Sequence, residues 1–132
     1  MISLLTDLEI VDNSGAKVGA CIKILKKGGR GSGVGVSGDN ITVAIKKIKP
    51  YGGNKIEKGQ VKRALIVRTK KEIYKRDGST LKFKKNAAII LKKFGNKNIW
   101  IPYGTRIKGF VSSSLFNQSQ MKIKSLSSAC IN

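Results

Sequence analysis

The sequence has no histidine, and only seven of its 132 residues are acidic. Without histidine the chain cannot supply an imidazole base or a histidine-containing nucleophile triad. The seven acids are scattered without a metal-loop pattern, and the two cysteines, Cys21 and Cys130, match no metal-ligand spacing. We therefore predict that the protein is not an enzyme and that it has no catalytic residues, no metal site and no cofactor.

Long hydrophobic runs are also missing. The longest uninterrupted aliphatic run is AAIIL at residues 87–91, which is too short to cross a bilayer. The N-terminal stretch MISLLTDLEIVDNSG carries acids early and lacks the basic and apolar regions of a secretory signal or transit peptide. We predict no membrane span and a protein made in the compartment where it works.

Aromatic residues are scarce, with eight in the whole chain. This scarcity argues against stacking on single-stranded bases as the main binding mode. The stretch GVGVSG at residues 33–38 matches G-x-G-x-x-G, but a β-branched run follows it, whereas a dinucleotide site requires a helix there. We interpret this stretch as part of a glycine-rich loop and expect no small-molecule substrate.

Positive charge is what the chain has in excess. Its 27 Lys and Arg residues give a formal net charge of +20, far beyond the roughly 2–8 that solubility needs. Such a charge is typical of proteins with a polyanionic partner. Nucleic acid is the favoured partner, and an anionic membrane or a merely solubilising surface are the alternatives. Because aromatics are few, we predict recognition of folded RNA through its phosphates and shape.

Short β-type runs divided by turn residues indicate a mainly β fold, a small closed or nearly closed barrel. The chain is long enough for one domain, residues 1–132, with one hydrophobic core. In the first run the alternation places Val18, Ala20, Ile22 and Ile24 on one face. A helix has only a weak signal, at about 112–120. The predicted strands cover residues 17–25, 41–48, 61–70, 80–84 and 87–93.

Residues 68–83, RTKKEIYKRDGSTLKF, read as a basic hairpin. Asp77-Gly78 is a strong turn signal, and it predicts a type I′ turn with positive φ at its central residues. A hairpin that leaves a barrel has little core to cover, so its charges can all face outward and enter a groove. A solvated hairpin with incidental charge is the alternative. The basic residues of the arms are Lys70, Lys71, Lys75, Arg76 and Lys82.

Several ordered blocks carry a family resemblance. The most specific is ALIVRTKKEIYKRDGSTLKFKKNAAII at residues 64–90, in which the basic hairpin is followed by Phe83, Asn86 and an aliphatic pair. Through these blocks the chain resembles the universal large-subunit ribosomal protein usually numbered fourteen, nearly end to end. The supporting blocks are VDNSGAK at 11–17, CIKIL at 21–25, KIEKGQVKRALIVRTK at 55–70, YGTRIKG at 103–109 and MKIKSL at 121–126.

The resemblance implies a small five-stranded β-barrel with a projecting β-hairpin and a short C-terminal helical segment. It implies a structural constituent of the large ribosomal subunit that binds folded large-subunit ribosomal RNA near the subunit interface. Bridges to the small-subunit RNA, the neighbouring proteins usually numbered three and nineteen, and a ribosome-silencing factor are the further partners that it implies. A free-standing RNA-binding barrel, acting as an RNA chaperone or translational regulator, is the alternative.

Site residues follow from the same resemblance. For the subunit interface or the silencing factor we expect Thr105, Arg106 and Lys122. Charge-assisted hydrogen bonds to phosphate would come from the basic residues, and Ser14 and Thr69 would act as neutral donors. The expected RNA-binding residues are Asn13, Ser14, Lys17, Lys23, Arg68, Thr69, Lys70, Lys71 and Arg76.

Some segments depart from the family pattern. Lys84-Lys85 stand where an acid usually precedes the Asn, NKNIW at 96–100 is an insertion, and the Ser-rich C-terminus leaves the terminal helix in doubt. Lys, Ile and Asn, which have A/T-rich codons, number 22, 17 and 8. Drift and composition together favour an organellar copy in the mitochondrial matrix. The plastid stroma and the cytoplasm of an A/T-rich bacterium are the alternatives.

Overall fold

The computed structural model describes residues 1–25, 33–50, 55–112 and 118–131. Residues 26–32, which precede the stretch GVGVSG, residues 51–54, and residues 113–117 of the segment given a weak helical signal lie outside the described residues. No helix in the described parts of the chain is long and apolar enough to cross a membrane.

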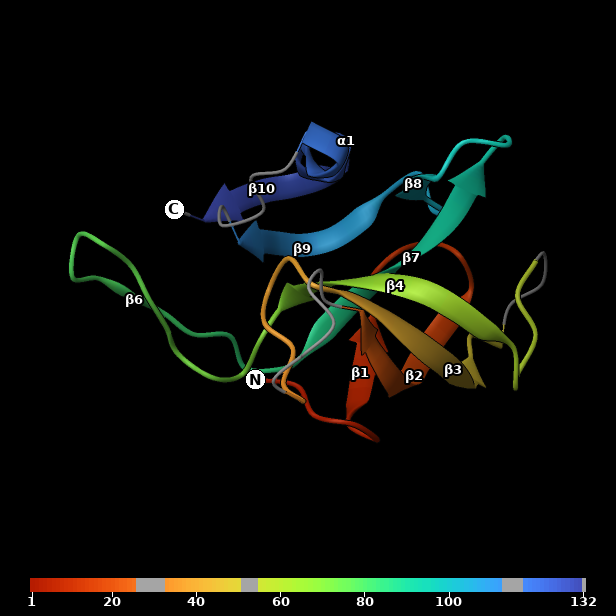
Figure 1. Cartoon of the computed structure of the whole chain (residues 1–132), viewed down its shortest axis with the longest axis horizontal. Helices are drawn as coiled ribbons and strands as arrows, with labels where there is room; N and C mark the ends of the chain where they lie inside the picture. Colours follow the sequence, from red (N-terminus) through yellow and green to blue (C-terminus); the bar gives the residue numbers. More distant parts are fainter. Residues whose placement is uncertain (26–32, 51–54, 113–117, 132) are drawn as a thin grey trace.

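Five strands close into a barrel (Figure 1). Neighbours along the chain pair antiparallel, and the ring is completed by a parallel pairing of the first and last strands, with Glu9 opposite Ala87 and Ile10 opposite Ala88. The prediction of a five-stranded barrel is therefore confirmed. The barrel strands are β1 (Asp7–Ile10), β2 (Ala16–Leu25), β3 (Asn40–Ile48), β4 (Val61–Arg68) and β7 (Ala87–Phe94).

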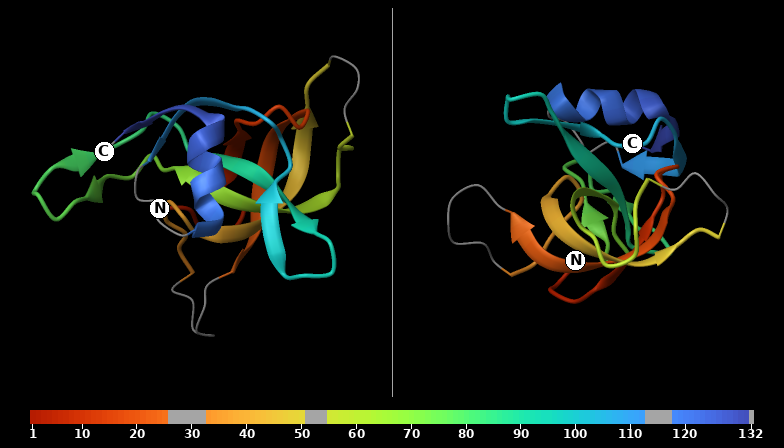
Figure 2. Two further views of the ribbon diagram at one scale, coloured as in Figure 1. Left: turned by 90° about the horizontal axis from the view of Figure 1, so that it is seen from above. Right: turned by 90° about the vertical axis from the view of Figure 1, so that its right-hand side faces the viewer.

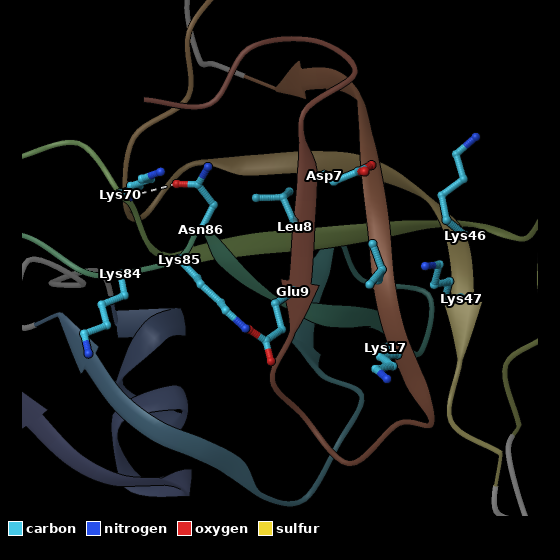
Figure 3. Close-up of a pocket in the computed structure, with 11 residues that line it drawn as sticks. Asp7, Leu8, Glu9, Lys17, Lys46, Lys47, Lys70, Lys84, Lys85 and Asn86 are labelled. Atoms are coloured by element: carbon cyan, nitrogen blue, oxygen red, sulfur yellow. Dashed lines mark hydrogen bonds and ion pairs between the residues drawn. The ribbon is translucent and has the colours of Figure 1, made fainter.

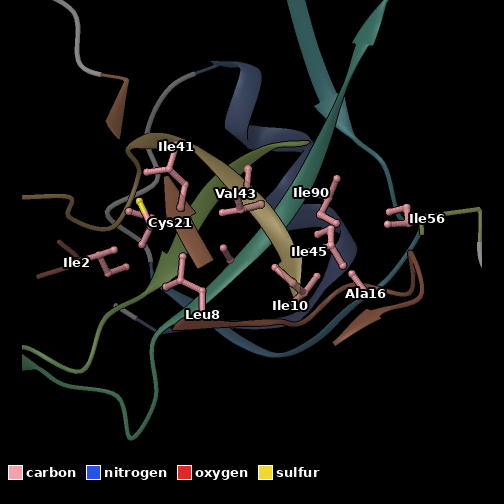
Figure 4. Close-up of a cluster of buried hydrophobic side chains, with 13 residues drawn as sticks. Ile2, Leu8, Ile10, Ala16, Cys21, Ile41, Val43, Ile45, Ile56 and Ile90 are labelled. Atoms are coloured by element: carbon pink, nitrogen blue, oxygen red, sulfur yellow. The ribbon is translucent and has the colours of Figure 1, made fainter. Parts of the chain in front are cut away.

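The barrel interior is filled by aliphatic side chains from alternate strand positions (Figure 4). In β3, Ile41, Val43 and Ile45 are all buried, as a period of two requires. The face predicted for β2 is wrong at its centre, because Ile22 is 44% exposed and Cys21 is fully buried. Bulges in the pairing of β2 with β3 shift the register, and each bulge moves the following side chains to the other face.

A second apolar layer lies outside the barrel, against β4 and β7. It contains side chains from these strands together with Val11, Ile107, Val111 and Ile123. The expectation of one core is therefore wrong. The continuous apolar runs of β4 and β7 carry the explanation, because a strand buried on both faces needs apolar residues at successive positions.

The C-terminal part of the chain covers that second layer. Figure 2 shows α1 and β9 over one side of the barrel, and β9 pairs in parallel with β10. The short C-terminal helix is confirmed, although it continues well beyond residue 120, where the weak signal ended. The elements here are β8 (Ile99–Pro102), which extends the sheet from β7, β9 (Ile107–Ser112), α1 (Gln118–Leu126) and β10 (Ser127–Ile131).

A hairpin projects from the barrel between β4 and β7, and we call residues 70–83 the finger (Figure 1). Its strands are β5 (Ile73–Tyr74) and β6 (Thr80–Leu81). The predicted hairpin is present, but the type I′ turn is wrong, because only Gly78 has positive φ, at 84°. Lys75 N donates to Ser79 O and Gly78 N donates to Lys75 O, so three residues form the loop and Gly78 takes the left-handed position.

Candidate nucleic-acid interface

A hollow of about 500 Å³ lies on the barrel surface beside the base of the finger (Figure 3). In Figure 3 the side chains of Lys84 and Lys85 lie on one side of β1, and those of Lys46 and Lys47 lie on the other. We call this feature the lysine hollow. Its lining residues are Asp7, Leu8, Glu9, Lys17, Val18, Lys46, Lys47, Lys70, Lys84, Lys85 and Asn86.

Charge in the lysine hollow is strongly one-sided. Six lysines and two acids line it, which leaves a formal charge of +4. One of the acids, Glu9, is already engaged, since Lys85 Nζ lies 3.5 Å from Glu9 Oε2. Like charges gathered on one concave surface raise the local potential and attract anions. The hollow is therefore suited to a ligand that carries several negative charges.

The strand pattern explains why these lysines reach the surface. β3 alternates buried and half-buried residues up to Ile45, and its last three residues, Lys46, Lys47 and Ile48, are exposed. Lys84 and Lys85 precede β7 and are exposed as well. Each pair stands where a strand leaves the apolar interior, so neither pair has a core to cover.

Asn86 joins the finger to the floor of the hollow. Its side-chain Oδ1 accepts a hydrogen bond from Lys70 N at 2.7 Å, and its carbonyl accepts one from Glu9 N at 3.1 Å. Lys70 begins the finger, so this side chain ties one leg of the finger to the chain that ends the other leg. The lysine hollow and the finger consequently form one continuous basic surface.

Along the finger, Lys71, Arg76 and Lys82 are exposed and Lys75 is half-buried. Lys71 Nζ lies 3.2 Å from Met1 Sδ. At the tip, Asp77 Oδ1 accepts hydrogen bonds from Ser79 N at 2.9 Å and Ser79 Oγ at 2.6 Å. These bonds from Ser79 lower the pKa of the exposed Asp77 carboxyl. The carboxyl is therefore ionised at neutral pH and keeps the hydrogen bonds that hold the turn.

Two of the expected RNA contacts, Asn13 and Ser14, belong to an internal network around Asp12. Asp12 is 1% exposed, and its carboxylate accepts hydrogen bonds from Ile90 N at 2.9 Å, from Ser14 N at 3.1 Å and from Ser14 Oγ. Lys49 Nζ donates to the Asp12 carbonyl at 2.9 Å. Ser14 is 7% exposed, so its hydroxyl serves this network in the free protein.

Asn13 holds the segment that carries the expected interface residues. Its Oδ1 accepts from Thr105 N at 2.8 Å and from Arg106 N at 3.4 Å, and its Nδ2 donates to Thr105 Oγ1 at 2.8 Å. Gly104 is needed for this approach, since a Cβ there would lie 2.5 Å from Asn13 Oδ1. We call Asp12, Asn13, Ser14 and residues 104–106 the turn network. It unites two expected RNA-binding residues, Asn13 and Ser14, with two expected interface residues, Thr105 and Arg106.

Arg68 and Thr69 also make internal bonds. Arg68 Nε donates to Phe110 O at 2.6 Å, and Nη2 donates to Lys108 O, so the guanidinium joins β4 to β9. Burial lowers the pKa of Arg68, and the charge of Glu9 opposes that shift. Thr69 is 1% exposed and its hydroxyl donates to Lys71 O at 3.2 Å. Their roles toward RNA stay predictions.

The remaining expected residues lie in different parts of the structure. Lys17 and Lys70 lie together in the lysine hollow. Lys23 on β2 and Lys122 on α1 are exposed but are not among the residues that line it, and Arg76 lies at the finger tip. The structure therefore gathers two of the expected contacts, extends the surface along the finger through Lys71 and Arg76, and leaves Lys23 and Lys122 apart.

Four lysines of the hollow were absent from the expected set: Lys46, Lys47, Lys84 and Lys85. The signal that could have found them is a lysine pair at the end of a β-branched run or just before one. Thr105 and Arg106 are exposed, as an interface would require. Among the described residues, no group of three or more Cys, Asp or Glu side chains is placed to hold a metal ion.

A comparison with protein families bears on this surface. The family model described as ribosomal protein L14p/L23e matches residues 1–131. The match includes every strand and the helix described above, together with the finger, the lysine hollow and the turn network. It covers nearly the whole chain.

Proposed function

The chain belongs to the ribosomal protein L14p/L23e family, and from this premise we propose that its lysine hollow and finger bind folded large-subunit ribosomal RNA. A structural protein of the large ribosomal subunit acts in translation and is not an enzyme. The observation that carries the proposal is the gathering of six lysines in one hollow of about 500 Å³ at the base of the basic finger.

The composition of the hollow favours phosphates over bases as the ligand. Lysine is a compact point charge that neutralises phosphate without reading sequence. No aromatic side chain is among the lining residues, so the hollow itself offers no platform for base stacking. A folded RNA brings phosphates from separate strands close together, and a concave cationic surface fits that arrangement better than it fits a single extended strand.

Contact with the small subunit belongs to the same proposal. Thr105 and Arg106 are exposed and are held from behind by Asn13. A side chain presented on a fixed backbone loses less conformational entropy on binding. This support suits a position near the subunit interface, with bridges to small-subunit RNA or a ribosome-silencing factor as the partner and Lys122 as a further contact. The proteins usually numbered three and nineteen are the proposed large-subunit neighbours.

The proposed compartment is the mitochondrial matrix. Its support is compositional, namely 22 Lys, 17 Ile and 8 Asn residues, whose codons are A/T-rich, together with the divergent C-terminal segment. Sedimentation of an organelle lysate tests this placement and the alternative of a free-standing RNA-binding barrel. Recovery of the chain almost wholly with mitochondrial large subunits supports both proposals, and a mainly free pool would contradict the structural role.

The phosphate-binding hollow is tested by reversing the charge of one lysine pair. We expect Lys46→Glu with Lys47→Glu to weaken binding to transcribed large-subunit RNA at least about tenfold at moderate salt, because two phosphate contacts are lost. The slope of log Kd against log salt should fall by about 1.4–1.8. The measurement is a filter-binding or anisotropy titration at several salt concentrations.

A matched control uses Lys92 and Lys93, which are also adjacent and exposed but lie on β7 outside the hollow. Lys92→Glu with Lys93→Glu makes the same change in net charge. We expect a clearly smaller loss of affinity for this pair. Equal losses for the two pairs would mean that overall charge and not the hollow attracts the RNA.

A further inference from the structure

One aromatic residue of the finger is placed as a binding residue rather than as a core residue. Tyr74 is 76% exposed, although it lies within a paired strand. Successive strand residues face opposite sides, and the apolar pair of the finger, Ile73 with Leu81, occupies the other side. On its own side Tyr74 is paired with Thr80, which is itself exposed. Its ring is therefore left in water by the fold.

The hydroxyl of Tyr74 has a partner that leaves the ring face open. Tyr74 Oη donates to Glu72 Oε2 at 3.5 Å, and Lys82 Nζ lies 3.5 Å from Glu72 Oε1. The Glu72 carboxylate thus holds the Tyr74 hydroxyl, and its charge is neutralised by Lys82 on the opposite arm of the finger. Glu72 is the only acid in the arms of the finger, so this pairing leaves the surroundings of the ring basic.

The other tyrosine and tryptophan rings with a nearby cation provide a contrast. Arg63 lies 4.3 Å from the centroid of Trp100, and Lys92 lies 5.7 Å from that of Tyr103. Trp100 and Tyr103 are also half-buried against the two cores. In the part of the chain that the structure describes, no cation lies over the ring of Tyr74. Its face is free for a flat partner.

We propose that Tyr74 stacks on an unpaired base of the large-subunit RNA, an inference that rests on the proposed function. The flanking residues select this partner. Lys75 and Arg76 follow Tyr74 directly, so a phosphate next to a stacked base would meet positive charge. Aromatic side chains stack on splayed bases of folded RNA without regard to sequence. The hollow would bind phosphates, and the finger would add one base contact.

A purely structural role for Tyr74 makes a different prediction. Aromatic residues favour strands, and a cross-strand pair with Thr80 adds a little to hairpin stability. Valine favours strands equally and has no ring. Tyr74→Val therefore separates the two roles, and Tyr74→Phe retains the ring while removing only the hydroxyl bond to Glu72.

The test measures the affinity of the full chain for transcribed large-subunit RNA. We expect Tyr74→Phe to bind within about twofold of the unaltered protein, and Tyr74→Val to bind about 5-fold to 150-fold more weakly, as loss of one stacked base predicts. The salt slope should stay unchanged for Tyr74→Val, because no phosphate contact is removed. Phe94→Ala removes an aromatic that is 60% exposed and ends β7, and it should leave affinity unchanged. In Figure 1 the tip of the β7 arrow points away from the finger.

The outcomes of this test distinguish the two proposals. Unaltered affinity for Tyr74→Val, with weakened binding for the Lys46 and Lys47 pair, would overturn the stacking inference and leave the proposed function standing. Absence of saturable binding by the unaltered protein would contradict the proposed function itself.

A second readout uses assembled large subunits. Ultraviolet irradiation should cross-link Tyr74 to a base, and trypsin should then release residues 72–75 carrying a nucleotide, since it cleaves after Lys71 and after Lys75. Mass spectrometry identifies the adduct. Cross-linked peptides from the lysine hollow but none from residues 72–75 would count against stacking.

Discussion

The lysine hollow and the turn network are both polar, but they use their polar groups in opposite ways. In the hollow six lysines surround a concave surface, and Lys85 forms a close ion pair with Glu9. In the turn network the polar groups bond to one another and to the backbone. The Asp12 carboxylate accepts three hydrogen bonds, and the Asn13 side chain takes part in three.

This difference teaches how to separate shape from binding within one basic surface. A buried polar group must be satisfied by the fold, because leaving it unpaired costs stability. An exposed cation that the fold does not use is available to a partner. By this criterion Asn13 and Ser14 maintain the shape of the loop that presents Thr105 and Arg106. Of the six hollow lysines, Lys85 is paired with Glu9, and the side chains of the other five have no ion pair within the described residues and are available to a partner.

Removing the carboxylate at the centre of the turn network should have the largest effect on stability. We expect Asp12→Ala to lower the free energy of unfolding by about 3 kcal/mol, because two backbone amides and a hydroxyl lose their acceptor. Urea unfolding followed by the fluorescence of Trp100, the single tryptophan, provides the measurement.

Asp7 supplies the matched control, because it is an exposed carboxylate that lines the lysine hollow. Asp7→Ala should change stability by no more than about 0.5 kcal/mol. It should strengthen RNA binding, since a negative charge leaves the hollow. Equal stability losses for Asp7→Ala and Asp12→Ala would remove the contrast between the two regions.

The close approach within the turn network should give an intermediate effect. We expect Gly104→Ala to destabilise the protein by about 2 kcal/mol, because the new Cβ would lie 2.5 Å from Asn13 Oδ1 and 3.2 Å from Asn13 N. Hydrogen exchange should show faster opening of the Thr105 amide, which donates to Asn13. Binding of RNA by the hollow should be unchanged.

A double-mutant cycle sharpens this result. Asn13→Ala alone should cost about 1 kcal/mol, since hydrogen bonds are lost without a clash. In Asn13→Ala with Gly104→Ala the clash with Oδ1 is relieved, so the double variant should be more stable than the sum of the single effects implies. Strict additivity would show that the Gly104 contact with the Asn13 side chain is unimportant.

The smallest expected effect is a local one at the finger tip. Because hydrogen bonds from Ser79 lower the pKa of Asp77, the ionised carboxyl stabilises the turn at pH above the ordinary aspartate value of 3.8. This stabilisation should be lost as the pH falls through the lowered pKa of the folded finger. Nuclear magnetic resonance titration of Asp77 and of the Ser79 amide follows the transition.

Ser79→Ala is the control for that titration. It should raise the titration midpoint of Asp77 toward the ordinary value, because the hydroxyl bond is removed. Global stability should be nearly constant in both proteins, since the carboxyl is fully exposed. An unchanged midpoint in Ser79→Ala would show that this hydroxyl does not hold the turn.

The sequence predicted the barrel and the finger because both depend on local signals. The alternation of Ile41, Val43 and Ile45 predicts a strand and its buried face, and Asp77-Gly78 predicts a turn. The bulges of β2 were not predictable in the same way, because they arise from pairing with β3 and not from the pattern of β2 itself. The turn type was misjudged for a related reason, since the loop length is set by how the two arms pair.

Composition by itself predicted a polyanionic partner, and the ordered blocks predicted the family, which the family model confirms. Only the tertiary structure decided which polar residues meet. The parallel pairing of β1 with β7 joins segments far apart in sequence, and it places Lys84 and Lys85 in the same hollow as Lys17 and Lys46. The same closure brings Asp12 to the Ile90 amide, so a nearby polar residue is committed to the fold. Charge is a property of the sequence, whereas its availability depends on what the fold has already bonded.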